Sequence, residues 1–179
     1  MKRVAVVGVT GSGKSTLATE LARRLGAPHI ELDALQWGPS WTPCPRDEFR
    51  QRVAEVTAGE TWVTDGNYGE ARSILWARAD TLVWLDYALP VILWRLVTRT
   101  LRRVLTREVL WGNNTETVRG AFFDKDSLFL YVFPSRKKQR AVYPRLLREE
   151  YAHLQVIHLR SPRETNAWLD GLRLNKPGK

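Results

Sequence analysis

Apolar residues gather in five short runs along the chain, over residues 3–7, 29–32, 61–64, 81–85 and 154–159. Their length, and the β-branched or aromatic residues that they contain, are typical of buried strands. Most of the runs are separated by segments in which apolar residues recur at helical spacing. This alternation predicts an α/β fold in which a five-stranded parallel sheet lies between two layers of helices.

The helical spacing predicts three helices between the strands, over residues 16–25, 46–58 and 90–105. We expect the third helix to turn four residues toward the core, Trp94, Val97, Leu101 and Val104. Two more helical patterns follow residue 127, and Pro134 is expected to break them apart. A final helix begins at Ser161, a good N-cap residue that is followed by proline.

The remaining segments are rich in polar residues, glycine and proline. Residues 34–45 are expected to form a loop, and the polar span 106–127 opens a lid-like excursion that reaches to about residue 140. Neither a linker nor an internal repeat interrupts the pattern. We therefore expect one domain over residues 1–174, followed by a polar tail over 175–179.

One motif identifies the chemistry of this domain. The run Gly8-Val9-Thr10-Gly11-Ser12-Gly13-Lys14-Ser15 matches the phosphate-binding P-loop, and it lies between a predicted strand and a predicted helix, as the motif requires. Its backbone N–H groups and the helix N-terminus favour an oxyanion. Lys14 is placed to reach the β- and γ-phosphates, and the Ser15 hydroxyl to bind Mg²⁺. The sequence thus predicts a P-loop NTPase fold whose ATP site comprises Gly8, Thr10, Gly11, Ser12, Gly13, Lys14, Ser15 and Thr16.

Three aspartates end predicted strands, and ligands of open α/β sheets lie beyond the carboxyl ends of the strands. Asp65 is our candidate for the carboxylate beside Mg²⁺, together with Ser15, although an ordinary Asp-Gly turn is the alternative. Asp33 is predicted either to contact the phosphoryl acceptor, as a proton acceptor, or to cap a short helix. For Asp86 we favour a structural role as a loop or cap residue.

Arginines are the candidates for neutralising the transferred phosphoryl group. The helix over 90–105 carries Arg95, Arg99 and Arg102 at spacings that predict one common face, although such a face is often simply solvated. A second basic cluster contains Arg136 and Arg140, which are one helical turn apart. Arg136 is a further catalytic candidate, and the cluster could instead bind nucleic acid. The three histidines show no metal-ligand spacing and are interpreted as structural.

Composition limits the partners and the cellular location that we expect for this domain. The formal net charge of +9 favours a polyanionic partner, for which ATP and a phosphorylated acceptor suffice, and DNA is a less favoured possibility. The single cysteine, Cys44, excludes an internal disulfide framework. No apolar run approaches the roughly 20 residues of a membrane span. A cytoplasmic location without a membrane partner is therefore expected.

These residues resemble adenylate-kinase-like P-loop proteins. The order of the P-loop, Leu32-Asp33, Asp65-Gly66-Asn67-Tyr68 and the strand that ends at Asp86 is most similar to the group called DNA topology-modulation proteins. The resemblance implies that Arg95 and Arg99 lie at the base of a lid, because adenylate kinases carry two arginines four apart there. It also implies a difference in the acceptor, since residues 33–37 lack the arginine that binds a nucleoside monophosphate in adenylate kinases.

Together these features favour a phosphotransferase that uses ATP and Mg²⁺ and carries Lys14, Asp65, Arg95, Arg99, Asp33 and Arg136 as its catalytic candidates. The acceptor is a small molecule or a nucleotide that the sequence does not identify. The alternatives are a nucleotide-gated protein that binds DNA or another acidic partner, and a slow ATPase.

Overall fold

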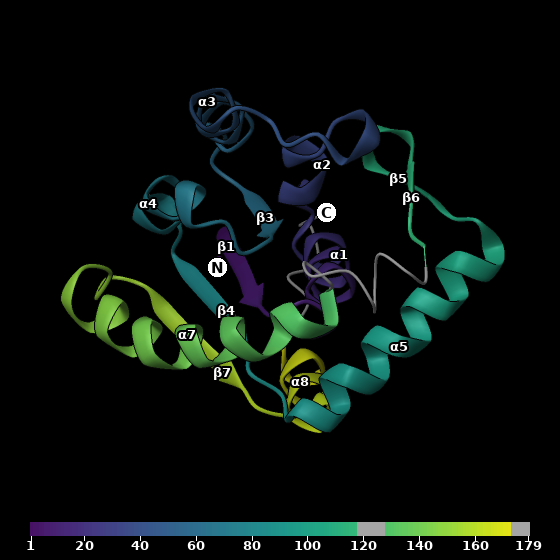
Figure 1. Cartoon of the computed structure of the whole chain (residues 1–179). Helices are drawn as coiled ribbons and strands as arrows, with labels where there is room; N and C mark the ends of the chain where they lie inside the picture. The colour runs from purple at the N-terminus through teal and green to yellow at the C-terminus, as the bar shows by residue number, and fades with distance from the viewer. Residues whose placement is uncertain (118–127, 173–179) are drawn as a thin grey trace.

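The computed structural model of the chain describes residues 1–117 and 128–172 (Figure 1). Its main sheet is parallel and has the strand order β2-β3-β1-β4-β7. The strands are β1 (Arg3–Gly8), β2 (His29–Glu31), β3 (Trp62–Asp65), β4 (Thr81–Leu85) and β7 (Gln155–Leu159). All five predicted strands are confirmed. Because β1 lies at the centre, the P-loop that follows it is flanked by the ends of β3 and β4.

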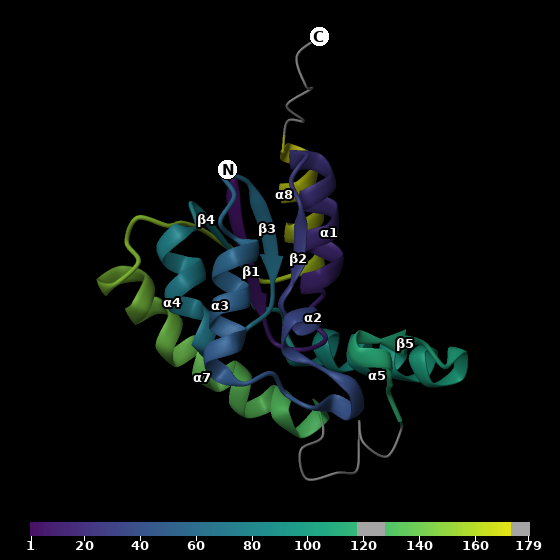
Figure 2. The same ribbon diagram turned by 90° about the horizontal axis from the view of Figure 1, so that it is seen from above.

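Helices cover both faces of the sheet, as predicted for the α/β fold. Figure 2 shows α1 (Lys14–Leu25) and α8 (Pro162–Gly171) on one side, and α3 (Arg46–Val56) and α4 (Gly69–Arg78) on the other. Alternate residues of β1 separate accordingly, with Val4 and Val6 in one core cluster and Ala5 and Val7 in the other. None of the helices in residues 1–117 and 128–172 is long and apolar enough to cross a membrane.

The predicted loop over residues 34–45 is wrong at its start. A short helix α2 (Leu32–Gln36) follows β2 directly, and one 3-10 turn η1 (Pro39–Trp41) lies further on. The structure also adds α4, which buries Ala71, Leu75 and Trp76. Burial of so few side chains leaves a weak periodic signal in the sequence.

The long helix α5 (Leu89–Thr106) is confirmed, but its buried face differs from the prediction. Ile92, Leu96 and Thr100 are buried, whereas Trp94 is 71% exposed and Leu101 is 46% exposed. Apolar residues occur on more than one side of this helix, so spacing alone does not select the core side. Figure 2 shows that α5 projects away from the sheet, so that less of its surface can pack against the core.

The predicted break at Pro134 is also wrong. Helix α7 (Leu128–Glu149) runs through both Pro134 and Pro144. A proline inside a helix costs about 3 kcal/mol. Here α7 packs against the rest of the protein through one row of buried side chains, Val132, Ser135, Gln139 and Tyr143. Tertiary packing thus overrides the local preference.

The predicted excursion over residues 106–140 contains two structured parts. A small antiparallel hairpin follows α5 and consists of β5 (Val109–Leu110), η2 (Trp111–Asn113) and β6 (Asn114–Thr115). The side chain of Asn114 ties it to the loop after α2, because it accepts a hydrogen bond from Trp41 N and donates one to Gly38 O. From residue 128 the chain belongs to α7. Residues 118–127 and the predicted tail over 175–179 lie outside the described residues, and the domain boundaries stay a prediction.

Candidate functional site

The backbone of the P-loop needs its glycines. Gly8, Gly11 and Gly13 have positive φ angles of 152°, 77° and 92°. A Cβ atom on Gly8 would lie 2.6 Å from Leu85 O, and one on Gly13 would lie 2.9 Å from a guanidinium nitrogen of Arg95. The loop therefore curves closely between β1, the end of β4 and α5, and α1 begins at Lys14. This is the strand, loop and helix context that the motif predicted.

Lys14 lies among the predicted site residues. Its ammonium group donates a hydrogen bond to Val9 O at 3.1 Å. Burial lowers the pKa of Lys14, the negative charges of Asp33 and Asp65 oppose this shift, and the positive charge of Arg99 adds to it. Asp33, Asp65 and Arg99, from three separate segments, therefore all lie close enough to Lys14 to affect its charge.

The carboxylate of Asp65 stands beside the P-loop serine. Ser15 Oγ donates a hydrogen bond of 2.5 Å to Asp65 Oδ2, and His29 Nε2 lies 2.9 Å from Asp65 Oδ1. Asp65 is buried at the end of β3 and is in register with Val6 of β1. The hydroxyl and the carboxylate are therefore adjacent where the sequence predicted Mg²⁺.

A cation at this position would need ligands from outside the protein. The part of the chain that the structure describes contains no group of three or more His, Cys, Asp or Glu side chains able to hold a metal ion. Mg²⁺ commonly keeps several waters and takes only one or two carboxylates together with phosphate oxygens. Ser15 and Asp65 fit such a shared site.

His29 contacts the candidate site, which its sequence pattern did not predict. The histidine, interpreted from the sequence as structural, lies against the second oxygen of Asp65. Its position follows from the pairing of β2 with β3, which sets His29 opposite Val63. Only the strand order could have revealed this neighbour, because 36 positions separate His29 from Asp65 in the sequence.

Asp33 lies in the first turn of α2, where Tyr68 fixes its side chain. The Tyr68 hydroxyl donates a hydrogen bond to Asp33 Oδ1. Burial, followed by the negative charge of Asp33, raises the pKa of Tyr68, so the phenol remains a donor. The N-cap position of α2 is occupied by Glu31 and not by Asp33. The capping alternative for Asp33 is therefore wrong.

Two of the three predicted α5 arginines reach the P-loop surroundings. Arg95 Nη1 donates to Ser12 O at 3.1 Å, and the guanidinium of Arg95 lies 5.2 Å from the centre of the Tyr87 ring. Burial lowers the pKa of Arg99, whose Nη2 lies 3.7 Å from Glu116 Oε1. Two buried polar atoms here, Ser12 Oγ and Arg99 Nε, lack a hydrogen-bond partner within the described residues. Such atoms are expected where a ligand supplies the partner.

The third predicted arginine lies on another side of α5. Arg102 is 68% exposed and pairs with Glu108, whereas Arg103 shares Glu116 with Arg99. The row that continues from Arg95 and Arg99 therefore ends at Arg103, and the predicted common face is wrong for Arg102. Steps of four residues keep this row aligned along the helix.

Asp86 and Arg136 belong to a second ionic cluster. Arg140 Nε lies 2.8 Å from Asp86 Oδ1, Arg136 Nε lies 3.6 Å from the same oxygen, and His158 Nε2 lies 3.3 Å from Oδ2. Arg136 also donates to Tyr87 O. Asp86 thus anchors α7 to the end of β4, in line with the structural role that we favoured. No contact among the described residues ties Arg136 to the P-loop, and its catalytic role stays a prediction.

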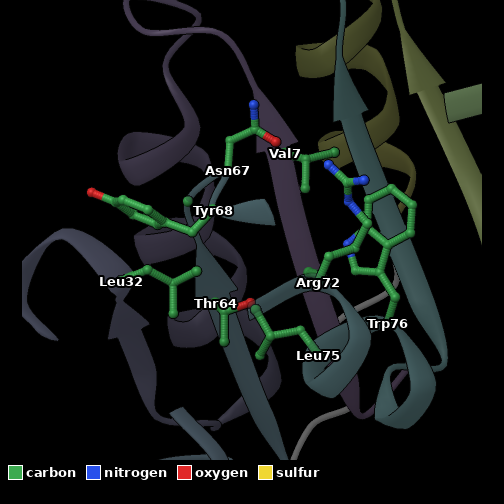
Figure 3. A pocket seen from close by; sticks show the side chains of 10 residues that line it. Val7, Leu32, Thr64, Asn67, Tyr68, Arg72, Leu75 and Trp76 are labelled. Atoms are coloured by element: carbon green, nitrogen blue, oxygen red, sulfur yellow. The ribbon is translucent and has the colours of Figure 1, made fainter. Parts of the chain in front are cut away.

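A small pocket opens on the opposite side of β1 and β3 from α1 (Figure 3). Val7 and Leu75 contribute apolar surface to it. Its polar lining follows the end of β3 and the first turns of α4, and includes Thr64, Asn67, Tyr68 and Arg72. Several lining residues are therefore close neighbours of Asp65 in the sequence. One of them, Tyr68, also binds Asp33.

Comparison with known proteins supports the fold. No family model matches the chain. A curated relative, the uncharacterized protein YqaC of Bacillus subtilis (strain 168), is 28% identical over 130 residues, which are 72% of each protein.

Solved structures of small-molecule kinases have similar folds. A shikimate kinase from Bacteroides thetaiotaomicron superposes with a TM-score of 0.59 at 17% identity, covering 96% of both chains. A gluconokinase from Sinorhizobium meliloti 1021 gives 0.53 at 21% identity, covering 96% of this chain and 93% of the other. The protein has a P-loop kinase-like fold resembling these enzymes.

Proposed function

We propose that the protein is a phosphotransferase that moves the γ-phosphoryl group of ATP to a hydroxyl group of a small acceptor. The observation that carries this proposal is the contact between Ser15 and Asp65 beside Lys14. A bare anion site would need only the P-loop and its lysine. A hydroxyl paired with a carboxylate adds the place for a divalent cation that phosphoryl transfer uses.

Each residue of the site has a distinct task in this proposal. The P-loop N–H groups and Lys14 bind the phosphates. Ser15 and Asp65 would hold Mg²⁺, which when bound would supply positive charge to offset the charge of the phosphates. His29 keeps the Asp65 carboxylate oriented toward Ser15. Arg95 and Arg99 come from α5 and neutralise the charge that spreads over the transferred group.

The acceptor is expected on the Asp33 side of Lys14. Its hydroxyl oxygen bonds to the γ-phosphorus while the bond from that phosphorus to the β,γ-bridging oxygen breaks, and ADP leaves. The hydroxyl proton passes to Asp33, whose Oδ2 has no hydrogen-bond donor within the described residues. Tyr68 holds the other oxygen and thus fixes the direction in which Asp33 accepts.

Transfer can be tested directly with γ-labelled ATP and hydroxylated small molecules. We expect the label to appear in a new phosphoester, and this transfer to disappear in the Lys14→Ala variant. Release of the label only as inorganic phosphate, whatever acceptor is present, would favour the slow ATPase instead.

The magnesium assignment predicts that Asp65→Asn and Asp86→Asn change different properties of the protein. Asp65→Asn should remove most of the gain in ATP affinity that Mg²⁺ provides, because the neutral amide no longer attracts the cation. Asp86→Asn should keep that gain and instead lower the melting temperature, because Arg136, Arg140 and His158 lose a buried counter-charge. Calorimetric titration with ATP, in excess Mg²⁺ and in EDTA, measures the first effect. A wild-type response to Mg²⁺ in Asp65→Asn would contradict the assignment.

A further inference from the structure

Arg72 is a cation without a counter-charge in the described structure. Its guanidinium carbon lies 5.2 Å from the centre of the Trp76 ring and 5.5 Å from that of Tyr143. Within residues 1–117 and 128–172 it forms no ion pair with a carboxylate. On α5, Arg99 and Arg103 share Glu116, whereas Arg95, like Arg72, lies over an aromatic ring and has no carboxylate partner within the same ranges.

The surroundings of Arg72 hold it in place without neutralising it. Aromatic faces attract a cation without cancelling its charge, and a guanidinium has more N–H donors than its hydrogen bond with the Tyr143 side chain uses. Arg72 is partly buried, and a charge removed from water is costly unless it is paired. Figure 3 shows the guanidinium beside the Trp76 ring, in the pocket that Val7 and Asn67 also line. A ligand oxyanion would supply the missing partner.

Asn67 lines the same pocket and is held by Tyr143. The Tyr143 hydroxyl donates a hydrogen bond to Asn67 Oδ1. Burial raises the pKa of Tyr143 to about 12, so this hydroxyl keeps its proton near neutral pH. The contact fixes the amide, and Figure 3 shows its nitrogen on the side of Asn67 that faces away from Arg72. Arg72 is therefore the charged donor of this pocket, beside a tyrosine–asparagine pair with a fixed geometry.

Tyr68 links the pocket to the proposed acceptor side of the site. Asn67 and Tyr68 follow Asp65 by two and three residues, and Tyr68 lines the pocket while it binds Asp33. We propose that the acceptor carries an anionic group, a carboxylate or a phosphate, and that Arg72 binds this group while an acceptor hydroxyl lies at Asp33. This inference rests on the proposed phosphotransferase function and names the substrate class of that site.

The shape of arginine supports an oxyanion in this role. A guanidinium binds carboxylate or phosphate through two parallel hydrogen bonds, which positions the ligand as well as attracting it. A neutral polyol could accept hydrogen bonds from the fork but would leave its charge unpaired. We therefore expect Arg72 to select among acceptors and to act mainly on their binding.

Matched acceptors test the selection. Transfer from γ-labelled ATP is compared within three pairs that differ in charge, namely gluconate with glucitol, shikimate with its methyl ester, and adenosine monophosphate with adenosine. We expect only anionic members to accept the label. Arg72→Met should then raise the acceptor KM on the order of 100-fold, a loss of binding free energy of about 2.7 kcal/mol. The change in kcat should be smaller. Arg72→Lys, which keeps the charge without the fork, should lie between.

Arg78→Met is the matched control, because Arg78 lies at the far end of the same helix and donates to Ala58 O. Its acceptor KM should equal that of the wild type. Equal use of a neutral counterpart, or an unchanged KM in Arg72→Met, would overturn the proposal. These results would leave ATP-dependent transfer itself intact, so the two failures are distinguishable.

A binding measurement decides the question even if none of the six compounds accepts the label. The Nε–H signal of Arg72 is followed by NMR in protein labelled at arginine and saturated with MgADP, with Arg72→Met identifying the signal. Inorganic phosphate serves as the probe for a phosphorylated acceptor and formate as the probe for a carboxylate. A saturable shift of the signal with both anions would show that Arg72 binds either group, and a shift with one alone would identify the group that it binds. No shift with either anion would overturn the proposal.

Discussion

At the scale of single residues, Lys14 shows how the site balances opposing charges. Burial lowers the pKa of Lys14, while Asp33 and Asp65 support the charged form and Arg99 opposes it. The folded protein therefore holds an ammonium group that its own surroundings do not fully stabilise. Phosphate oxygens would complete that stabilisation. Lys14 is therefore expected to bind ligand and not to stabilise the core.

This balance predicts that Lys14→Met weakens ATP binding but not the fold. Loss of a charge-assisted contact should reduce ATP affinity about 10- to 100-fold or more. Because the folded-state pKa is below the usual 10.5, protonated Lys14 destabilises the fold at neutral pH, and this penalty disappears as the pH rises through the folded pKa toward 10.5. The variant should thus melt at or above the wild-type temperature at pH 7, with a difference that shrinks in alkaline buffer.

Calorimetric titration measures the ATP affinity, and thermal unfolding followed by circular dichroism at several pH values measures the stability. A variant that binds ATP as well as the wild type would refute the P-loop assignment. A variant that melts well below the wild type at pH 7 would show that Lys14 supports the fold.

At the scale of elements, α5 joins the core to the phosphate site. Its buried residues Ile92 and Leu96 fix the helix beside the P-loop, and Gly11 passes so close that a Cβ there would lie 2.9 Å from Ile92 O. The adjacent row presents Arg95 and Arg99. Because core residues hold the same helix, the two arginines are positioned with little freedom, which favours a role in transition-state stabilisation.

We therefore expect Arg95→Ala and Arg99→Ala to lower kcat on the order of 10³-fold, as the loss of a transition-state arginine does. ATP affinity should change much less, because the contact strengthens as charge develops. Arg102→Ala is the control, since Arg102 is exposed on another side of α5. The check is steady-state release of ADP from each variant, and normal turnover in Arg99→Ala would exclude the proposed role.

At the scale of the whole molecule, the net charge of +9 leaves room for a polyanionic partner besides ATP. Lys137 and Lys138 are exposed on α7, in the helix that also carries Arg136 and Arg140. DNA, the less favoured partner among the sequence-based expectations, is therefore the polyanion to test. The arginines beside the P-loop are less suited to a duplex, because they are partly buried.

For the whole protein, we predict that any DNA affinity falls steeply with salt, is not raised by ATP, and comes from α7. Replacing Lys137 and Lys138 with alanine should reduce the salt slope by about one per removed charge, while ATP turnover stays unchanged. Fluorescence anisotropy with duplex DNA over a series of salt concentrations measures the slope. ATP-enhanced DNA binding combined with low turnover on every acceptor would instead favour a nucleotide-gated binding protein.

Local patterns in the sequence determined the elements and the type of ligand site. The five strands could be predicted because each is an apolar run, and burial on both faces of a parallel sheet demands such runs. The P-loop could be predicted because the residues that shape it are consecutive. Asp65 was a candidate because it ends a strand and precedes Gly66, whose φ of 146° suits glycine.

Only the tertiary structure decided which distant residues meet. The strand order places β3 between β1 and β2, and this order brings Ser15, Asp65 and His29 together. Long-range packing kept α7 intact through Pro134, and Asp86 engaged Arg136 at the end of β4. The lack of a carboxylate near Arg72 within the described residues is likewise a property of the folded chain. Neighbours in space depend on contacts between segments, and the periodicity of one segment carries no information about its partner.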